Sequence, residues 1–224
     1  MKLREYQNNI AIQAADKLTA FGCCYLSMEC RTGKTLTALS AADKFKAKSV
    51  LLITKLKAIP SIKNDYIALH PSFKLDVINY ESAHKVTGKY DLVIIDEAHS
   101  LGAYPKPSKR TQEIRTICEG SPVLYLSGTP SPESYSQLYH QFWVCSKSPW
   151  KNYKSFYKWA KEYVYTRQKK VNGYLINDYS CANKPKIDND TRNLFISYSQ
   201  EQAGFEVNIN EHILQEIGRA SCRE

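Results

Sequence analysis

Residues 92–99 read Leu92-Val93-Ile94-Ile95-Asp96-Glu97-Ala98-His99, in which four apolar side chains are followed at once by two carboxylates. Continuous apolar and β-branched residues are typical of a strand that is buried on both faces, as in the centre of a parallel sheet. Similar apolar runs recur at residues 24–28, 50–54, 75–79 and 123–127. The sequence therefore predicts an α/β fold, a mostly parallel sheet with helices on both faces.

Helices are predicted between these strands, at residues 35–48, 59–69 and 111–118. Ser131-Pro132 has the residue types of a helix start and predicts a helix that reaches Val144. A further helix is predicted over residues 149–163, and Val171-Asn172-Gly173-Tyr174 is typical of a two-residue hairpin turn.

A second polar motif, Cys30-Arg31-Thr32-Gly33-Lys34-Thr35, follows the first predicted strand. It matches the second half of a phosphate-binding loop, with Met28 in place of the first glycine. In such a loop backbone N–H groups face the phosphates, the lysine reaches the β and γ oxygens, and the threonine ligates Mg²⁺. The predicted ligands are thus ATP and Mg²⁺, and the binding residues are Arg31, Thr32, Gly33, Lys34 and Thr35. The alternative is a basic helix start without a ligand.

The two carboxylates after residue 95 fit the same chemistry. A carboxylate at this strand end emerges at the carboxyl edge of the sheet, beside the phosphate loop. Asp96 is predicted to hold Mg²⁺ together with Thr35, and Glu97 to orient and deprotonate the attacking water. The alternative is an acidic helix cap after a buried strand, which the phosphate-loop motif upstream disfavours.

Over residues 3–145 these motifs resemble the first RecA-like lobe of superfamily-two helicases of the DEAD/DEAH type and translocases. Leu3-Arg4-Glu5-Tyr6-Gln7 resembles the adenine-reading glutamine motif, which implies an adenine contact by Gln7; a solvated helix residue is the alternative. Ser127-Gly128-Thr129-Pro130 resembles the motif that links hydrolysis to movement, and implies that Ser127 and Thr129 are partners of His99. Residues 50–55 and 79–82 resemble the strand-contacting motifs. The nucleic-acid contacts that they imply are Thr54, Lys55, Tyr80 and Glu81, with Thr54 and Lys55 as a plain strand end as the alternative.

Within that family the motifs most resemble the Swi/Snf-like DNA helicases of bacteriophages. The resemblance implies an ATP-dependent DNA helicase or translocase whose catalytic residues are Lys34, Asp96, Glu97 and His99. It also implies DNA as the partner and a second RecA-like lobe in the same chain. Two alternatives stay open: a duplex translocase of remodeller or restriction type that does not unwind, and a nucleic-acid-binding module with a non-hydrolysing nucleotide site.

The chain is basic, with 31 Lys and Arg against 22 Asp and Glu and a formal charge of +9, which favours a polyanionic partner. Much of this excess lies in a Tyr-rich extension over residues 149–200. The extension is either a solvated face with tyrosines packed beneath it or a nucleic-acid contact, since single-strand binding uses aromatic rings beside cations.

The expected organisation is a RecA-like ATP-binding lobe over residues 1–148, the extension, and the start of a linker over residues 201–215 to a missing second lobe. Residues 216–224 resemble a translated sequencing adapter and are left out of the fold. Without the arginine finger of a second lobe, weak ATP hydrolysis is expected. The seven cysteines show no metal or disulfide spacing, and no apolar run approaches the ~18 residues of a membrane span, so free thiols in the cytoplasm are expected.

Overall fold

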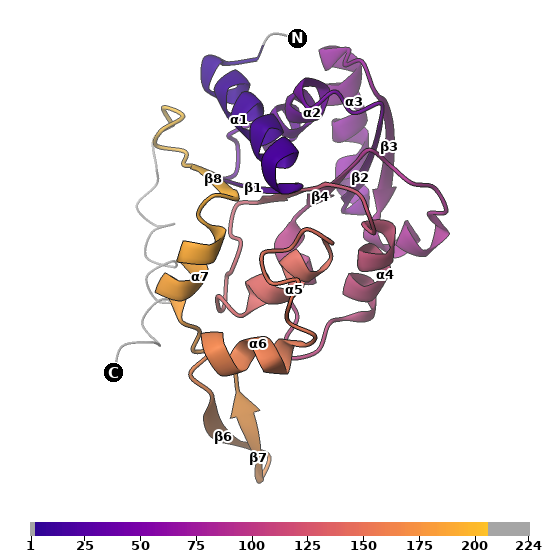
Figure 1. The fold of residues 1–224 in the computed structure, drawn as a ribbon. Helices are drawn as coiled ribbons and strands as arrows, with labels where there is room; N and C mark the ends of the chain where they lie inside the picture. Colours follow the sequence, from indigo (N-terminus) through magenta and orange to yellow (C-terminus); the bar gives the residue numbers. More distant parts are fainter. Residues whose placement is uncertain (1–2, 206–224) are drawn as a thin grey trace.

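A computed structural model describes residues 3–205, and its main feature is a six-stranded parallel sheet in the order β3-β2-β4-β5-β1-β8 (Figure 1). The strands are β1 (Cys23–Met28), β2 (Ser49–Thr54), β3 (Lys74–Asn79), β4 (Leu92–Asp96), β5 (Val123–Ser127) and β8 (Phe195–Tyr198). The predicted α/β class is confirmed, and the arrangement is consistent with a RecA-like lobe.

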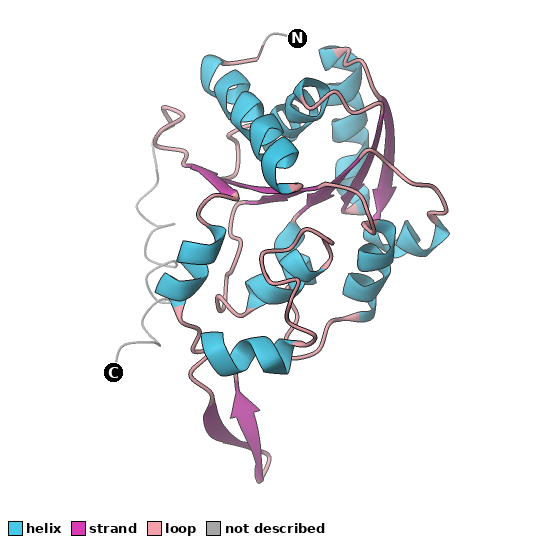
Figure 2. Ribbon diagram, viewed as in Figure 1, coloured by secondary structure: helices cyan, strands magenta, loops and turns pink. Residues whose placement is uncertain are grey.

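Helices cover both faces of this sheet (Figure 2). One layer contains α1 (Glu5–Phe21), α2 (Lys34–Lys44) and α3 (Ile59–Leu69). The other contains α4 (Lys109–Ile117), α5 (Gln137–Trp143), α6 (Phe156–Tyr163) and α7 (Lys184–Thr191). Short 3₁₀ turns follow three of the strands: η1 (Leu56–Ala58), η2 (Tyr80–Lys85) and η3 (Ala98–Leu101).

The strand sequences explain why both faces are covered. In β4, Val93 and Ile95 pack into the core on the α5 side, whereas Leu92 and Ile94 pack into the core on the α1 side. All four side chains are fully buried. A strand with apolar residues at every position is stable only between two layers, which is why the continuous run of residues 92–95 becomes a central strand.

The predicted strands agree with the structure to within one residue at each end, and the helix over residues 59–69 is confirmed. Two predicted helices are too long at one end. The helix over residues 35–48 ends at Lys44, because Lys46 adopts a left-handed φ of 60°. The helix over residues 149–163 begins at Phe156, where Ser155 Oγ accepts a hydrogen bond from the Lys158 backbone N–H.

The prediction that Ser131-Pro132 begins a helix is wrong, since α5 starts at Gln137. The side chain of Gln137 reaches back, and its Oε1 accepts hydrogen bonds from the backbone N–H groups of Glu133 (3.1 Å) and Ser134 (3.4 Å). These bonds hold the preceding residues in turns, so the cap-like pair does not lead into a helix.

Residues 149–200 contain the expected helix and hairpin and two elements that the sequence does not predict. β6 (Arg167–Val171) and β7 (Tyr174–Asp178) pair antiparallel, and Asn172 and Gly173 between them both have positive φ, as a two-residue hairpin turn requires. The additional elements are α7 and β8, and β8 pairs in parallel with β1. The extension therefore contributes an edge strand to the main sheet.

Several expectations concern features outside these elements. No helix within residues 3–205 has the length and apolarity to cross a bilayer. In the same part of the chain the cysteines are free thiols, at positions 23, 24, 30, 118, 145 and 181. Residues 206–215 of the expected linker over residues 201–215, and the adapter-like residues 216–224, lie outside the described residues.

Candidate functional site

The predicted phosphate-loop, carboxylate and coupling residues follow the carboxyl ends of three adjacent strands. β5 lies between β1 and β4, and the register pairs Ser27 with Ser127 and Asp96 with Leu126. The segments that follow these strands therefore leave the sheet side by side, as at the ligand-binding edge of other open α/β sheets. A Cβ atom on Gly128 would lie 3.7 Å from Lys34 Nζ, which places the segment after β5 against the phosphate loop.

The loop between β1 and α2 is closed by its own hydrogen bonds. Thr32 Oγ1 donates to the Glu29 carbonyl oxygen over 2.7 Å, and Lys34 Nζ donates to the Met28 carbonyl oxygen over 2.8 Å. The Lys34 ammonium is thereby held inside the curve of the loop. Arg31 is exposed and has a left-handed φ of 65°, a strained conformation for a non-glycine residue that is common in ligand-binding loops.

Gly33 is the residue where the loop enters α2, and glycine is required there for two reasons. Its φ of 79° lies in the left-handed region, and a Cβ atom would lie 2.2 Å from Gln7 Nε2. The missing side chain lets α1 approach the loop closely. The backbone N–H groups at the start of α2 are thus available to phosphate oxygens, which agrees with the predicted nucleotide site.

Tyr6 and Gln7 of α1 brace this loop. The Tyr6 hydroxyl donates to the Thr32 carbonyl oxygen over 3.0 Å, and Gln7 Nε2 donates to the same oxygen over 3.4 Å. Gln7 Oε1 accepts from the Arg4 backbone N–H over 2.9 Å, and Gln7 is buried. The alternative of a solvated helix residue at Gln7 is therefore wrong, and its adenine contact stays a prediction.

Asp96 ends β4 and is held by two neighbours. Thr54 Oγ1 donates to Asp96 Oδ2 over 2.7 Å, and the Tyr80 hydroxyl donates to the Asp96 carbonyl oxygen. Burial raises the pKa of Asp96, while the Thr54 hydrogen bond acts in the opposite direction and stabilises the carboxylate. The neighbourhood thus orients the carboxylate that the sequence assigns to Mg²⁺.

The four predicted nucleic-acid contacts fall into two groups. Thr54 and Tyr80 are buried, and each supports the end of β4 through its hydroxyl. Lys55 and Glu81 are exposed, and Glu81 forms an ion pair with Arg110 over 3.1 Å. Contact of these residues with nucleic acid stays a prediction. The structure shows a further role for Thr54 and Tyr80, because both hydrogen-bond to Asp96 and hold it in place.

His99 lies between Glu97, which follows β4, and Ser127, which ends β5. Its Nδ1 lies 2.9 Å from Ser127 Oγ and 3.3 Å from Glu97 Oε2. Ser127 Oγ also accepts from the Thr129 backbone N–H over 3.1 Å. Glu97 has a left-handed φ of 52°, which turns the chain sharply at the strand end. The structure therefore brings together all four residues, and their coupling role stays a prediction.

The residues present fit an Mg²⁺ ion that is bound together with phosphates. Within residues 3–205, no group of three His, Cys, Asp or Glu side chains could form a metal site on its own. Mg²⁺ at phosphate sites takes one or two protein ligands and fills its other positions with phosphate oxygens and water. Thr35, at the start of α2, and Asp96, at the end of β4, provide such a pair.

Residues that the sequence does not single out also hold the loop. Tyr198, in β8, stacks on Tyr6 with ring centroids 4.5 Å apart. Glu29 Oε2 accepts a hydrogen bond from the Gln200 backbone N–H over 2.7 Å. Tyr6 lies inside the Leu3-Arg4-Glu5-Tyr6-Gln7 motif, so the sequence offers a signal that could have identified it. Tyr198 and Gln200 are far away in sequence, and no local pattern marks them.

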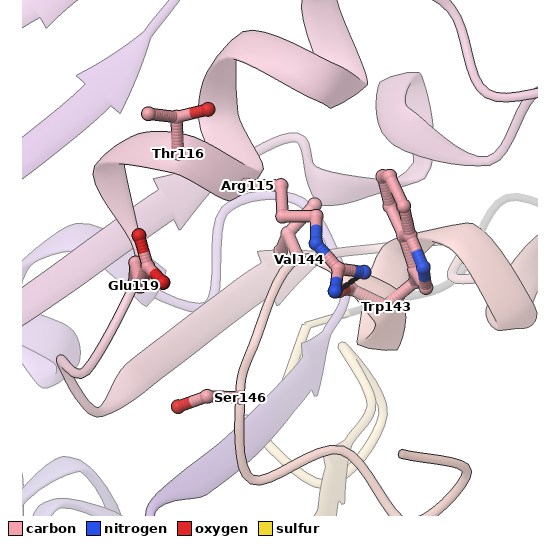
Figure 3. Close-up of a pocket in the computed structure, with 6 residues that line it drawn as sticks. All are labelled: Arg115, Thr116, Glu119, Trp143, Val144 and Ser146. Atoms are coloured by element: carbon pink, nitrogen blue, oxygen red, sulfur yellow. Dashed lines mark hydrogen bonds between the residues drawn. The ribbon is translucent and has the colours of Figure 1, made fainter. Parts of the chain in front are cut away.

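Two pockets differ in their position relative to these motifs. One, of about 320 Å³, adjoins the site and is lined in part by Ser27, Pro130 and Ser197. The other, of about 180 Å³, lies between α4 and the end of α5 (Figure 3). In it the Arg115 guanidinium lies 3.8 Å from the centre of the Trp143 ring and donates to the Trp143 carbonyl oxygen over 3.0 Å. Its lining contains none of the predicted site residues.

Comparison with known protein families provides the remaining observation. The family described as "SNF2-related domain" matches residues 7–179. The chain belongs to the SNF2-related domain family. The match to this family runs from Gln7 through the phosphate loop, the two carboxylates and the segment after β5 into the extension, so the predicted superfamily-two first lobe is confirmed at the family level.

Other comparisons add little to the SNF2-related assignment. No curated protein matches the chain. One similar solved structure is described as "ATP-dependent Type ISP restriction-modification enzyme LlaBIII bound to DNA", with 18% sequence identity and a TM-score of 0.42. The similarity covers 60% of this SNF2-related chain and 13% of that one.

Proposed function

We propose that this chain is the ATP-binding lobe of an ATP-dependent motor that moves on DNA, either a helicase or a translocase. One observation carries the proposal: the strand register that brings Lys34, Asp96 and Ser127 to the same edge of the sheet. Such a motor needs a phosphate-binding lysine, a carboxylate for the metal, and a segment that responds to hydrolysis. Membership of the SNF2-related family supports the same conclusion.

Each residue at this edge has a separate task in the proposal. Lys34 binds phosphate oxygens, and Thr35 and Asp96 hold Mg²⁺, which neutralises phosphate charge. Glu97 orients the attacking water and takes its proton. His99 lies within 3.3 Å of Glu97 Oε2 and 2.9 Å of Ser127 Oγ, so it can link the state of Glu97 to the segment after β5.

DNA as the partner is supported by charge and by the resemblance of the motifs. The formal charge of +9 favours a polyanion, and binding should weaken steeply as salt rises. Lys55, at the carboxyl end of β2, is exposed at the same sheet edge and is a candidate phosphate contact. A second RecA-like lobe completes the DNA-binding groove and supplies an arginine finger, so hydrolysis by this lobe alone is expected to be slow.

Calorimetry with ATP and Mg²⁺ tests the nucleotide site directly. Lys34→Ala is expected to lose most of the affinity, whereas Lys44→Ala, at the other end of α2, is expected to bind as the wild type does. Equal binding by Lys34→Ala and the wild type contradicts the assignment. Slow ATP hydrolysis that Glu97→Gln abolishes supports a motor; ATP binding without any Glu97-dependent hydrolysis indicates the non-hydrolysing module instead.

A further inference from the structure

The β6–β7 hairpin extends away from the sheet and its helices (Figure 1). Every residue of the hairpin except Asp178 is exposed, and Tyr174 and Leu175 next to the turn are 76% and 68% exposed. Within residues 3–205, the Tyr174 side chain has no ring contact or hydrogen bond. Two strands without a packed face are only marginally stable. Exposed apolar side chains at the end of such a ribbon therefore suggest a binding partner.

The strand register shows which side chains share a face. Val171 is directly opposite Tyr174, and Lys169 is opposite Ile176, so these four side chains lie on one face. On this face the Tyr174 ring lies beside Val171, and the next position along β6 carries the cation Lys169. The other face carries Lys170 opposite Leu175. Each face thus carries at least one lysine beside apolar side chains.

The charges around the hairpin are mostly positive. Arg167, Lys169 and Lys170 belong to β6, and α6 adds the exposed Lys158 and Lys161 at the base. Asp178 lies 3.8 Å from Lys169 and neutralises part of this charge. No acidic partner of Lys170 is found in the described part of the chain. The hairpin surface combines positive charge with exposed apolar side chains. This combination matches a polyanion that also carries flat rings better than it matches a protein surface that is only acidic or only apolar.

The base of the hairpin is fixed by hydrogen bonds. The Ser136 hydroxyl donates to the Tyr179 carbonyl oxygen, and the Ser134 hydroxyl donates to the Ser180 carbonyl oxygen, both over 2.6 Å. The Tyr165 backbone N–H donates to the Cys181 carbonyl oxygen over 2.8 Å. A ribbon that is already held in place loses little conformational entropy when it binds.

We propose that this hairpin binds a single-stranded segment of nucleic acid, with one base stacked on Tyr174 and an adjacent phosphate near Lys169 on the same face. Aromatic rings stack on any base, and cations neutralise the backbone, which is how single strands are bound without sequence preference. The proposal deepens the proposed function and rests on its nucleic-acid part. It assigns a strand contact to an element outside the sheet edge that carries the nucleotide site.

Fluorescence anisotropy of a labelled oligothymidylate, titrated with the full chain at low salt, tests the proposal. Tyr174→Leu keeps an apolar side chain but removes the ring, and is expected to weaken binding at least about fivefold. Tyr174→Phe keeps the ring and is expected to bind within about twofold of the wild type, since a stacked phenyl ring replaces the phenol. Phe21→Leu, at the end of α1 in the other layer, is the matched control for the loss of an exposed ring and should have no effect.

The phosphate contact is tested by the salt dependence of the same binding. Lys169→Gln, on the Tyr174 face, is expected to lower the slope of log affinity against log salt by about 0.7, the value for one phosphate contact on a single strand. Lys44→Gln removes the same charge from an exposed site at the end of α2 and should leave the slope unchanged. Unaltered ATP binding by each variant shows that the fold is intact.

The outcomes separate this proposal from the function on which it rests. Wild-type binding that is unchanged in Tyr174→Leu and Lys169→Gln overturns the hairpin contact alone. If Tyr174→Leu loses the same affinity for a duplex as for the single strand, the proposed stacking of a base on Tyr174 is wrong. Self-association that is lost in Tyr174→Leu while nucleic-acid affinity is kept assigns the hairpin to a protein contact instead. No binding of any nucleic acid by the wild type overturns the nucleic-acid part of the proposed function.

Discussion

The Lys34 ammonium donates a hydrogen bond of 2.8 Å to the Met28 carbonyl oxygen, across the loop that joins β1 to α2. The lysine therefore helps to hold the loop in a closed curve. Bound phosphate oxygens would compete with that carbonyl for the same donor. The ammonium is thus pre-positioned, and its loss should affect ligand binding far more than folding.

Replacing Lys34 with Ala is expected to cost about 1 kcal/mol of stability at most, which is the value of one hydrogen bond. In the wild type, ATP with Mg²⁺ at about 100 times its Kd should add about 2.7 kcal/mol to the free energy of unfolding. The variant should lack this increment. Urea titrations with and without nucleotide measure both quantities, and equal increments in the two proteins would contradict the assignment of Lys34.

Asp96→Asn is expected to abolish hydrolysis and still leave the protein at least as stable as the wild type at pH 7. Burial raises the pKa of Asp96 above its ordinary value of 3.8, so the folded state disfavours the charged form. The stability that this group contributes is complete below pH 3.8 and is lost as the pH rises through the folded-state pKa. Thermal melts of both proteins at pH 4 and pH 7 test this. A Tm of the variant well below that of the wild type at pH 7 would be inconsistent with it.

Glu97→Gly is expected to stabilise the protein by about 1 kcal/mol, because Glu97 has a φ of 52° and glycine adopts the left-handed region without strain. The same change removes the group that we assign to the attacking water, so hydrolysis should be lost. Glu97→Gln is the matched control: it should lose hydrolysis without a gain in stability. Chemical denaturation and ATPase assays on the pair give the two readouts. A destabilised Glu97→Gly protein would refute the argument from backbone strain.

Ser127→Ala is expected to leave ATP binding intact and to reduce the stimulation of hydrolysis by DNA, because it removes the 2.9 Å contact with His99 Nδ1. Ser121→Ala removes a hydroxyl just before β5, at the opposite edge of the sheet, and serves as the control. Basal and DNA-stimulated rates are measured for each protein. Equal stimulation of Ser127→Ala and the wild type would show that His99 does not act through Ser127.

His140 should make the protein less stable as the pH falls from 6.5 to about 4. Burial lowers the pKa of His140 from 6.5 to about 4, although the Ala103 carbonyl oxygen accepts its Nδ1 proton over 2.6 Å. The unfolded chain therefore binds a proton across this window that the folded chain does not, at a total cost of about 3 kcal/mol at the acid end. His140→Asn does not titrate, so its stability should change less between pH 4.5 and pH 7.5 in urea titrations. Parallel pH profiles of the two proteins would contradict this.

The strands could be predicted because a strand buried on both faces has to be apolar throughout, and the run of residues 92–95 has no other stable environment. The sequence motifs of a phosphate loop and of two carboxylates were equally recognisable, since that chemistry needs fixed residue types at fixed spacing, and their nucleotide and metal contacts stay predictions. The start of α5 was not visible, because Gln137 overrides the cap signal of Ser131-Pro132 through hydrogen bonds to the backbone before it.

The rest of the site depends on contacts between distant parts of the chain. Thr54 has the pattern of an ordinary strand end, and its bond to Asp96 follows from the pairing of β2 with β4. Phe195 begins a four-residue strand that is too short to stand out by its own pattern. Its place beside Tyr25, on which it stacks with ring centroids 4.6 Å apart, is determined by the sheet rather than by neighbouring residues.

The position of β8 beside β1 also has a consequence for the time course of folding. β1 carries the phosphate loop, yet one of its two neighbouring strands ends at Tyr198, close to the end of the described chain. During synthesis at about 5–20 residues per second, Tyr25 has to wait on the order of 10 s for Phe195 to leave the ribosome. Throughout that interval the edge of β1 that later pairs with β8 is open to other strands, so the nascent chain is exposed to aggregation at the strand that leads into the predicted phosphate loop.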